Sequence, residues 1–178
     1  MNTAFSSKLD FADLSNIERI LMTTDGTLTE ILQAYYREPI NLVKLSEKLT
    51  TASEIDVLDV CSGEEVLERT ILLQGKHSKK TFVYAESIIA IEKLDTSLRS
   101  SMRNWLLNSD VPLGRLWLEH RLETFKEMID QDQAAANHLQ SFFDIPREHP
   151  LLTRTYRVFS QNKKIMLITE KFPRNYLD

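Results

Sequence analysis

The stretch of sequence that decides the fold reads LLTRTYRVF at residues 151–159, SQNK at residues 160–163 and KIMLITEKF at residues 164–172. The first and third segments are rich in β-branched, aromatic and other apolar residues, whereas the four residues between them are polar. Two such segments on either side of a short polar turn are typical of a β-hairpin. The sequence therefore predicts two adjacent antiparallel strands at this end of the chain.

The same pattern occurs earlier in the chain. Residues 65–74 and 81–92 are rich in strand-forming residues, and GKHSKK separates them at residues 75–80. This arrangement predicts a second hairpin. Apolar and polar residues alternate after Pro39, which predicts a further strand from residue 40 onward.

Other segments favour helices. Apolar residues recur at helical spacing in residues 15–22, 28–35 and 95–107, and Asp25 is the expected N-cap of the second of these helices. Residues 122–130 fit a helix or a strand equally, and residues 134–139 predict a short helix. Hairpins combined with a few helices predict the α+β class, with a single, mainly antiparallel β-sheet and flanking helices.

Length and charge restrict the possible functions. The chain has 178 residues, with 22 Lys and Arg against 26 Asp and Glu, and a formal net charge of -4. This length fits a single domain, residues 1–178, in which residues 1–12 are expected to be flexible. Domains that bind nucleic acid usually carry clustered basic residues, so we expect no nucleic-acid partner.

The sequence also predicts where the protein works. No apolar run approaches the roughly 20 residues that a membrane-spanning helix needs, so no membrane span is expected. The first residues lack the features of a secretory signal, which predicts a cytoplasmic location. The single cysteine, Cys61, cannot form an internal disulfide, in agreement with a reducing compartment.

Four predicted strands each place one ionisable residue among apolar neighbours, because residues two apart in a strand share a face. These residues are Arg69, Glu86, Arg154 and Glu170. Converging on one apolar concavity, they would suit a small, mostly apolar anion: arginine binds a carboxylate and glutamate accepts a hydrogen bond from a hydroxyl. The alternatives are internal ion pairs, or strand registers that turn some of these side chains toward water.

Other kinds of site find little support. The four histidines are His77, His120, His138 and His149, and none lies at a metal-ligand spacing from Cys61 or from another histidine. The sequence has no phosphate-binding loop, no dinucleotide fingerprint and no nucleophile elbow. We therefore expect no metal site.

Seven short motifs follow one another along the chain. They are TDGTLT at residues 24–29, ER at 68–69 before ILL at 71–73, YAES at 84–87, PLGR at 112–115, LET at 122–124, RTY at 154–156 and ITEKFP at 168–173. In this order they resemble the chorismate lyase family, above all its broad branch of 4-hydroxybenzoate synthases outside the enterobacterial type. The resemblance spans residues 14–174, nearly the whole chain.

The resemblance implies a fold and an activity. It implies a chorismate lyase-like sheet that cleaves chorismate into 4-hydroxybenzoate and pyruvate in a closed internal pocket, without metal or cofactor. It assigns Arg69 to the ring carboxylate and Glu170 to the region of the ring hydroxyl, which makes these two the catalytic candidates. It also assigns backbone contacts with the substrate to Leu113 and Gly114, and a flap position to Thr27.

One position departs from the enterobacterial pattern. Where that type has an arginine on the strand after the first hairpin, this chain has Glu86, which we keep as a substrate-binding candidate. The second carboxylate of chorismate then needs another cation. Its face assignment makes Arg154 the expected one.

Two readings of the function follow from the resemblance. The first is a cytoplasmic lyase that acts as a monomer on chorismate and supplies the synthesis of a quinone or another aromatic-derived compound. The second is a non-catalytic domain that binds or senses an aromatic carboxylate, because the same fold serves as the effector-binding domain of certain transcription regulators. Turnover of chorismate distinguishes the two readings.

Overall fold

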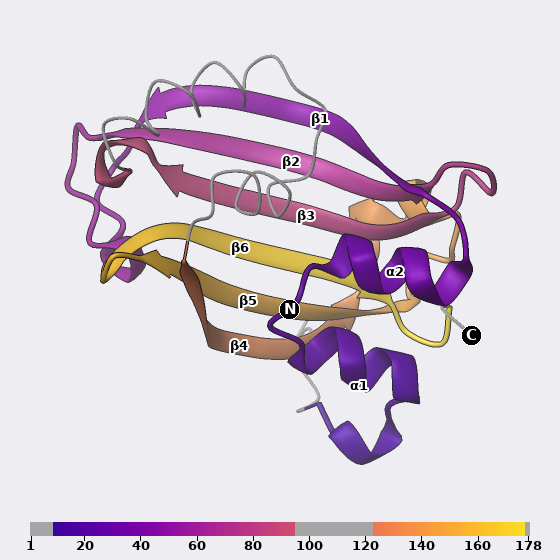
Figure 1. The fold of residues 1–178 in the computed structure, drawn as a ribbon. Coiled ribbons are helices and arrows are strands. Elements are labelled where there is room, and N and C mark those ends of the chain that lie inside the picture. Colours follow the sequence, from indigo (N-terminus) through magenta and orange to yellow (C-terminus); the bar gives the residue numbers. More distant parts are fainter. Residues whose placement is uncertain (1–8, 95–122, 177–178) are drawn as a thin grey trace, which may run out of the picture.

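The computed structural model describes residues 9–94 and 123–176. In this part of the chain, one antiparallel sheet of six strands has the order β1-β2-β3-β6-β5-β4 (Figure 1). Short helices accompany it. The α+β class with a mainly antiparallel sheet, predicted from the two hairpins, is therefore confirmed.

The sheet consists of two antiparallel meanders of three strands each. Their strands are β1 (Ile40–Thr51), β2 (Glu65–Gly75) and β3 (Thr81–Ala90), then β4 (Thr124–Ala135), β5 (Pro150–Ser160) and β6 (Lys163–Pro173). Strands β3 and β6 join the meanders, and Ser87 lies opposite Ile168 in this pairing. Both predicted hairpins are present, as β2–β3 and β5–β6, and the strand predicted after Pro39 is β1.

Strand β4 shows that the segment at residues 122–130, which fitted a helix or a strand, is mostly strand. It also corrects the prediction for residues 134–139. Residues 124–135 form a strand that pairs with β5 as far as Ala135, opposite Pro150. The short helix predicted over residues 134–139 is therefore wrong at its start, because sheet pairing overrides the helix propensity of the alanines. The 3-10 turn η4 (Asn137–Leu139) and the short helix α5 (Gln140–Phe143) follow the strand.

Helices α1 (Asn16–Thr23) and α2 (Leu28–Tyr36) precede the sheet in the chain. A capping box begins α1: the Ser15 hydroxyl accepts a hydrogen bond from the Glu18 N–H, and the Glu18 carboxylate accepts one from the Ser15 N–H. The prediction that Asp25 caps α2 is wrong. Thr27 occupies the N-cap position, because the chain first turns at Gly26, whose N–H donates to Thr24 Oγ1.

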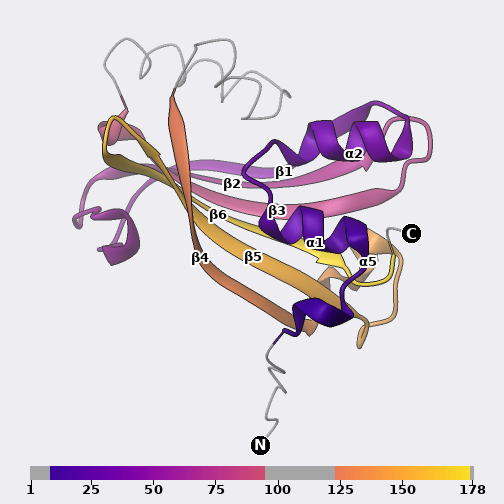
Figure 2. The same ribbon diagram turned by 60° about the horizontal axis from the view of Figure 1, so that its bottom comes forward.

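We call the side of the sheet that carries α1 and α2 the inner face (Figure 2). Apolar side chains of the two helices pack there against apolar side chains of the strands. The helix residues include Leu21, Met22, Leu28 and Leu32, and the strand residues include Leu42, Leu73, Val83, Ala85, Leu152 and Phe172. This cluster fills one half of the inner face, and its composition shows which strand positions point inward.

The opposite side, the outer face, has apolar clusters at both ends. Phe143 of α5 packs against Leu72 and Tyr84 at one end. At the other end, Leu58 of the 3-10 turn η2 (Asp56–Leu58) packs against Val66. Most buried strand positions therefore belong to the central strands β2, β3, β5 and β6, whereas the edge strands β1 and β4 are mostly half-buried or exposed.

No helix within residues 9–94 or 123–176 is both long and apolar enough to cross a membrane. The helix predicted over residues 95–107 and the turn predicted over residues 111–115 lie outside the described residues. Two further 3-10 turns, η1 (Phe11–Asp13) and η3 (Ile91–Lys93), complete the described elements.

Candidate active site

Three of the four predicted charged residues lie together on the inner face. Arg154 on β5 lies opposite Glu170 on β6, which in turn lies opposite Ala85 on β3. Ala85 belongs to the core beneath the two helices, so all three side chains point inward. Arg69 on β2 lies opposite Ser87, two residues from Ala85, and therefore shares this face.

Glu86 does not join them. It lies opposite Thr70 on β2 and Thr169 on β6, and each of these is the direct neighbour of an inward-facing residue. Its side chain is exposed on the outer face and accepts a hydrogen bond from the Tyr84 hydroxyl at 2.7 Å. The prediction that all four charges converge is therefore wrong for Glu86.

The alternation of residues along β3 predicted the wrong face for Glu86, because this strand has apolar side chains on both sides. Phe82 packs in the inner core, whereas Tyr84 packs with α5 on the outer face. The pairing register shifts between Leu73 and Gln74 of β2, opposite this part of β3. Apolar neighbours along β3 therefore do not identify the inner face.

The centre of the site is an ion pair within the sheet. Arg154 Nε donates to Glu170 Oε2 at 2.6 Å, and the Tyr156 hydroxyl donates to Glu170 Oε1 at 3.0 Å. Arg154 is only 1% exposed and Glu170 is 8% exposed. Burial, followed by the nearby Glu170 charge, raises the pKa of Tyr156 well above its usual value, so this phenol remains a hydrogen-bond donor.

The two terminal nitrogens of the Arg154 guanidinium differ in their hydrogen bonds. Its Nη1 donates to the Thr24 carbonyl oxygen at 3.1 Å. Its Nη2 is buried and has no hydrogen-bond partner among residues 9–94 and 123–176. A buried donor that lacks a partner costs free energy, so this nitrogen is suited to an anionic ligand.

Arg69 forms the second buried ion pair. Its Nε lies 3.1 Å from Glu47 Oε2 on the neighbouring strand β1, and its side chain is 1% exposed. Lys44 lies 3.6 Å from the other oxygen of the same carboxylate. Strands β2 and β6 are two strand spacings apart, roughly 10 Å. The inner face therefore carries two buried arginines, each beside a glutamate, on either side of β3.

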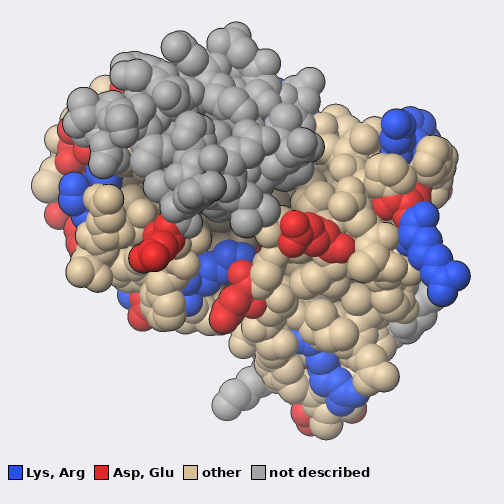
Figure 3. All heavy atoms as spheres, viewed as in Figure 1, with Lys and Arg blue, Asp and Glu red and all other residues tan. Residues whose placement is uncertain are grey.

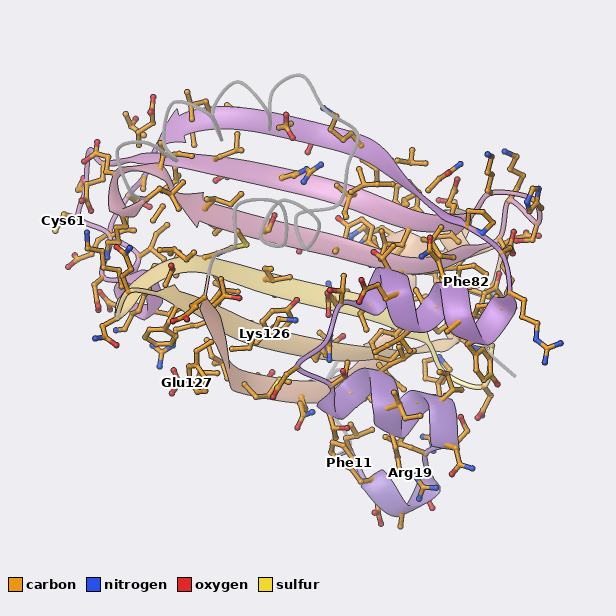
Figure 4. The ribbon with its side chains drawn as sticks, in the orientation of Figure 1. Phe11, Arg19, Cys61, Phe82, Lys126 and Glu127 are labelled. Carbon is orange, nitrogen blue, oxygen red and sulfur yellow. The ribbon has the colours of Figure 1, made fainter. Side chains whose placement is uncertain are left out.

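A further cation reaches the site from β4. Lys126 Nζ donates to the Gly26 carbonyl oxygen at 3.1 Å and lies 5.1 Å from the centroid of the Tyr156 ring. Burial lowers the pKa of Lys126, and the Glu170 carboxylate acts in the opposite direction. In Figure 4, Lys126 lies across the sheet, whereas the next residue, Glu127, points away from its centre.

Lys126 was not among the site residues predicted from the sequence. Residues 122–130 fit a helix or a strand equally, so no face was assigned to their side chains. Recognition of β4 as an edge strand would have placed Lys126 and Met128 on one side of it.

The turn between α1 and α2 closes over these charges. Gln131 donates to the Met22 carbonyl oxygen at 2.7 Å, beside the bonds from Arg154 to Thr24 and from Lys126 to Gly26. Thr27, the predicted flap position, follows Gly26 directly in the chain. The predicted substrate contacts Leu113 and Gly114 lie outside the described residues.

A separate hollow of about 290 Å³ lies mainly against the outer face. Its lining includes Glu68, Thr70, Glu86, Ile88 and Thr169. These side chains lie on the other side of the sheet from Arg154 and Glu170. No group of three or more His, Cys, Asp or Glu side chains arranged to hold a metal ion occurs in the described part of the chain.

The fold places the chain in a class of known domains. The effector domain of PhnF from Mycobacterium smegmatis superposes with a TM-score of 0.64 at 14% sequence identity, over 86% of this chain and 91% of that domain. At this identity the likeness shows the fold alone. The sheet therefore has the architecture of this effector domain.

Within this fold class, the chain belongs to the family of Rv2949c-like chorismate pyruvate-lyases, which matches residues 22–177. The chorismate pyruvate-lyase of Mycobacterium leprae is 30% identical over 175 residues, covering 95% of this chain and 80% of the relative. That of Mycobacterium tuberculosis strain H37Rv is 28% identical over 183 residues, covering 98% and 88%. The resemblance to chorismate lyases carried by the seven motifs is thus confirmed.

Proposed function

We propose that this protein is a chorismate lyase that converts chorismate into 4-hydroxybenzoate and pyruvate. The observation that carries the proposal is the buried trio of Arg154, Tyr156 and Glu170, in which one guanidinium nitrogen lacks a hydrogen-bond partner among the described residues. Such a site offers a donor to an anion and an acceptor to a hydroxyl at the same point. Chorismate carries both groups close together.

The arrangement of the charges fits the shape of chorismate. Its ring carboxylate and its ring hydroxyl stand on opposite carbons of the ring, so their two binding groups must be separated by more than the ring itself. Arg69 and Glu170 stand two strand spacings apart on one face, roughly 10 Å. Arg69 accordingly binds the ring carboxylate, and Glu170 accepts a hydrogen bond from the hydroxyl.

The enolpyruvyl ether stands on the ring carbon next to the hydroxyl. Its carboxylate therefore lies on the Glu170 side of the ring, where Arg154 Nη2 is an available donor. Both buried arginines are held by glutamates at 2.6 Å and 3.1 Å, so their positions are fixed before the substrate arrives. Preorganised cations avoid the free-energy cost of reorientation during the reaction.

The reaction breaks one carbon–oxygen bond and one carbon–hydrogen bond. The ether oxygen leaves with the enolpyruvyl group, and the ring carbon that bears the hydroxyl loses its hydrogen as a proton. The ring becomes aromatic as 4-hydroxybenzoate, and the leaving group takes up a proton on its methylene carbon to become pyruvate. Aromatisation supplies much of the driving force, so the side chains mainly hold the reactive conformer. In the proposed binding mode, Glu170 lies beside the carbon that loses the proton.

The decisive experiment is incubation of the purified protein with chorismate. Formation of pyruvate and 4-hydroxybenzoate in equal amounts is expected, and absence of both products would reject the lyase. Binding of chorismate or 4-hydroxybenzoate without turnover would instead support a sensor domain.

A pair of variants tests the site itself. Arg69→Ala is expected to lose most of the activity, because the ring carboxylate loses its cation. Lys76→Ala, in the exposed turn between β2 and β3, is the matched control and is expected to keep full activity. Equal effects of the two substitutions would show that Arg69 does not bind substrate.

A further inference from the structure

Lys126 brings an additional positive charge to the site. Arg154 and Arg69 each lie within 3.1 Å of a carboxylate oxygen, so these two pairs are formally neutral. Lys126 is half-buried and forms no ion pair with any of residues 9–94 and 123–176, and its ammonium donates to one backbone carbonyl there. An ammonium has three donors, so two of them are available to a ligand.

The charged groups around Lys126 come from three elements. Glu170 on β6 and Asp25 in the turn between α1 and α2 are its acidic neighbours, and Arg154 on β5 is its basic neighbour. Asp25 is exposed to solvent, which weakens its effect, and Glu170 is already bonded to Arg154 and Tyr156. The ammonium therefore lies in a partly desolvated place where another anion would stabilise it.

Lys126 and Arg154 flank the same aromatic ring. The Lys126 ammonium lies 5.1 Å and the Arg154 guanidinium carbon 5.2 Å from the centroid of the Tyr156 ring, whose hydroxyl donates to Glu170. Figure 3 shows one small basic patch, bordered by acidic side chains, at the surface of this face over β5 and β6. An anion beside Glu170 is thus within the field of two cations from two strands.

We infer that Lys126 is a substrate-binding residue that, together with Arg154, binds the enolpyruvyl carboxylate of chorismate while keeping its bond to the Gly26 carbonyl. The inference rests on the proposed function. A carboxylate has two oxygens and takes several hydrogen bonds, whereas Arg154 offers it only Nη2 because Nε and Nη1 are engaged. Lys126 supplies the remaining donors and ties the turn at residues 24–27 to the bound substrate.

This role makes Lys126 a specificity residue. Chorismate carries two carboxylates, and 4-hydroxybenzoate carries only the ring carboxylate that Arg69 binds. The contribution of Lys126 is therefore expected for the substrate and not for the product. A lysine that merely held the turn in place would affect both ligands alike.

The test compares substrate and product in one set of variants. Lys126→Gln keeps a donor for the Gly26 carbonyl but removes the charge, and Lys126→Arg keeps the charge. Lys164→Met removes a lysine that bonds to exposed Asp59, and it serves as the control. The KM for chorismate and the inhibition constant of 4-hydroxybenzoate are measured for each protein.

Lys126→Gln is expected to raise the KM about 10-fold or more, since a hydrogen bond to a charged group has this order of effect. The inhibition constant of 4-hydroxybenzoate is expected to stay nearly unchanged, and Lys126→Arg is expected to recover most of the loss. Equal weakening of both ligands, or an unchanged KM, would overturn the inference while leaving the lyase intact. Failure of the native protein to bind or convert chorismate would reject the proposed function itself.

A folding defect would not end the test. Should Lys126→Gln fail to fold, Lys126→Met takes its place and Lys126→Arg remains the charged reference. The ratio of the chorismate KM to the product inhibition constant is then compared between these two variants. An equal ratio in both would overturn the inference.

Discussion

Two ion pairs of equal length stand on opposite sides of the sheet. On the inner face, Arg154 lies 2.6 Å from Glu170, and the two side chains are 1% and 11% exposed. On the outer side, Arg157 lies 2.6 Å from Glu127, with exposures of 22% and 43%. The two arginines are three residues apart on β5. Distance alone therefore says little about what each pair does.

The difference lies in the surrounding water. Removing one partner of a buried pair leaves a charge without compensation, whereas an exposed charge is solvated at once. The same solvation makes an exposed pair a poor place to hold an anion in one orientation. The buried pair is costly for folding, but it offers the fixed charges that binding of chorismate requires.

The largest expected effect is on turnover. Glu170→Gln removes the negative charge and replaces one acceptor oxygen with an NH2 donor, and it is expected to lower kcat about 100-fold or more. Glu127→Gln is the matched change in the exposed pair and is expected to leave kcat nearly unchanged. Steady-state kinetics with chorismate measures both, and similar kcat values for the two variants would remove the functional distinction between the faces.

The next effect is on stability. Arg154→Ala leaves Glu170 buried without its cation and is expected to lower the free energy of unfolding by about 3–5 kcal/mol. Arg157→Ala is expected to lower it by less than about 1 kcal/mol. Urea denaturation followed by circular dichroism gives both values. A loss of similar size at the two positions would mean that burial does not separate the pairs.

Two tyrosines extend the comparison to neutral donors. Tyr156 donates to buried Glu170 at 3.0 Å, and Tyr84 donates to exposed Glu86 at 2.7 Å. Tyr156→Phe is expected to cost about 1.5–3 kcal/mol of stability, and Tyr84→Phe less than about 1.5 kcal/mol. The same denaturation experiment measures them, and the reverse order would contradict the assignment of the faces.

The last effect appears only at alkaline pH, and solvent around the exposed Glu86 keeps it small. Burial and the hydrogen bond to Glu86 raise the pKa of Tyr84 to about 12, whereas a tyrosine in the unfolded chain has a pKa of about 10. The folded state therefore keeps a proton that the unfolded state loses, and this stabilisation is complete below about pH 10 and is lost toward about pH 12. The stability difference between the native protein and Tyr84→Phe is expected to shrink over that range. A constant difference would contradict the shifted pKa.

Sequence patterns were enough to assign a charged side chain to a face of the sheet where one face of its strand was plainly apolar. Alternation along β5 and β6 placed Arg154 and Glu170 on one side, and alternation along β2 did the same for Arg69. The partner of Arg69 could not be foreseen, because Glu47 looks like an ordinary polar residue of a partly solvated strand. Ion pairs across a sheet depend on strand order, which a single sequence does not reveal.

The failures have a common physical origin. Strand β3 is covered on both faces, so the neighbours of Glu86 did not identify its side. The start of strand β4, at the edge of the sheet, fits a helix as well as a strand, so Lys126 was assigned to no face. Asp25 was a reasonable N-cap by residue type, but the hydrogen bond between Gly26 and Thr24 delays the start of α2.

The three bonds that hold the turn between α1 and α2 have a consequence for the order of folding. They join Met22, Thr24 and Gly26 to residues at least 100 positions later in the sequence. Contacts of such long range form slowly, because the intervening chain must be ordered first. On the ribosome, the two helices emerge well before β4 and β5 and cannot be anchored by them until those strands are made. We therefore expect the helices to dock in a late step of refolding, after the second meander has formed.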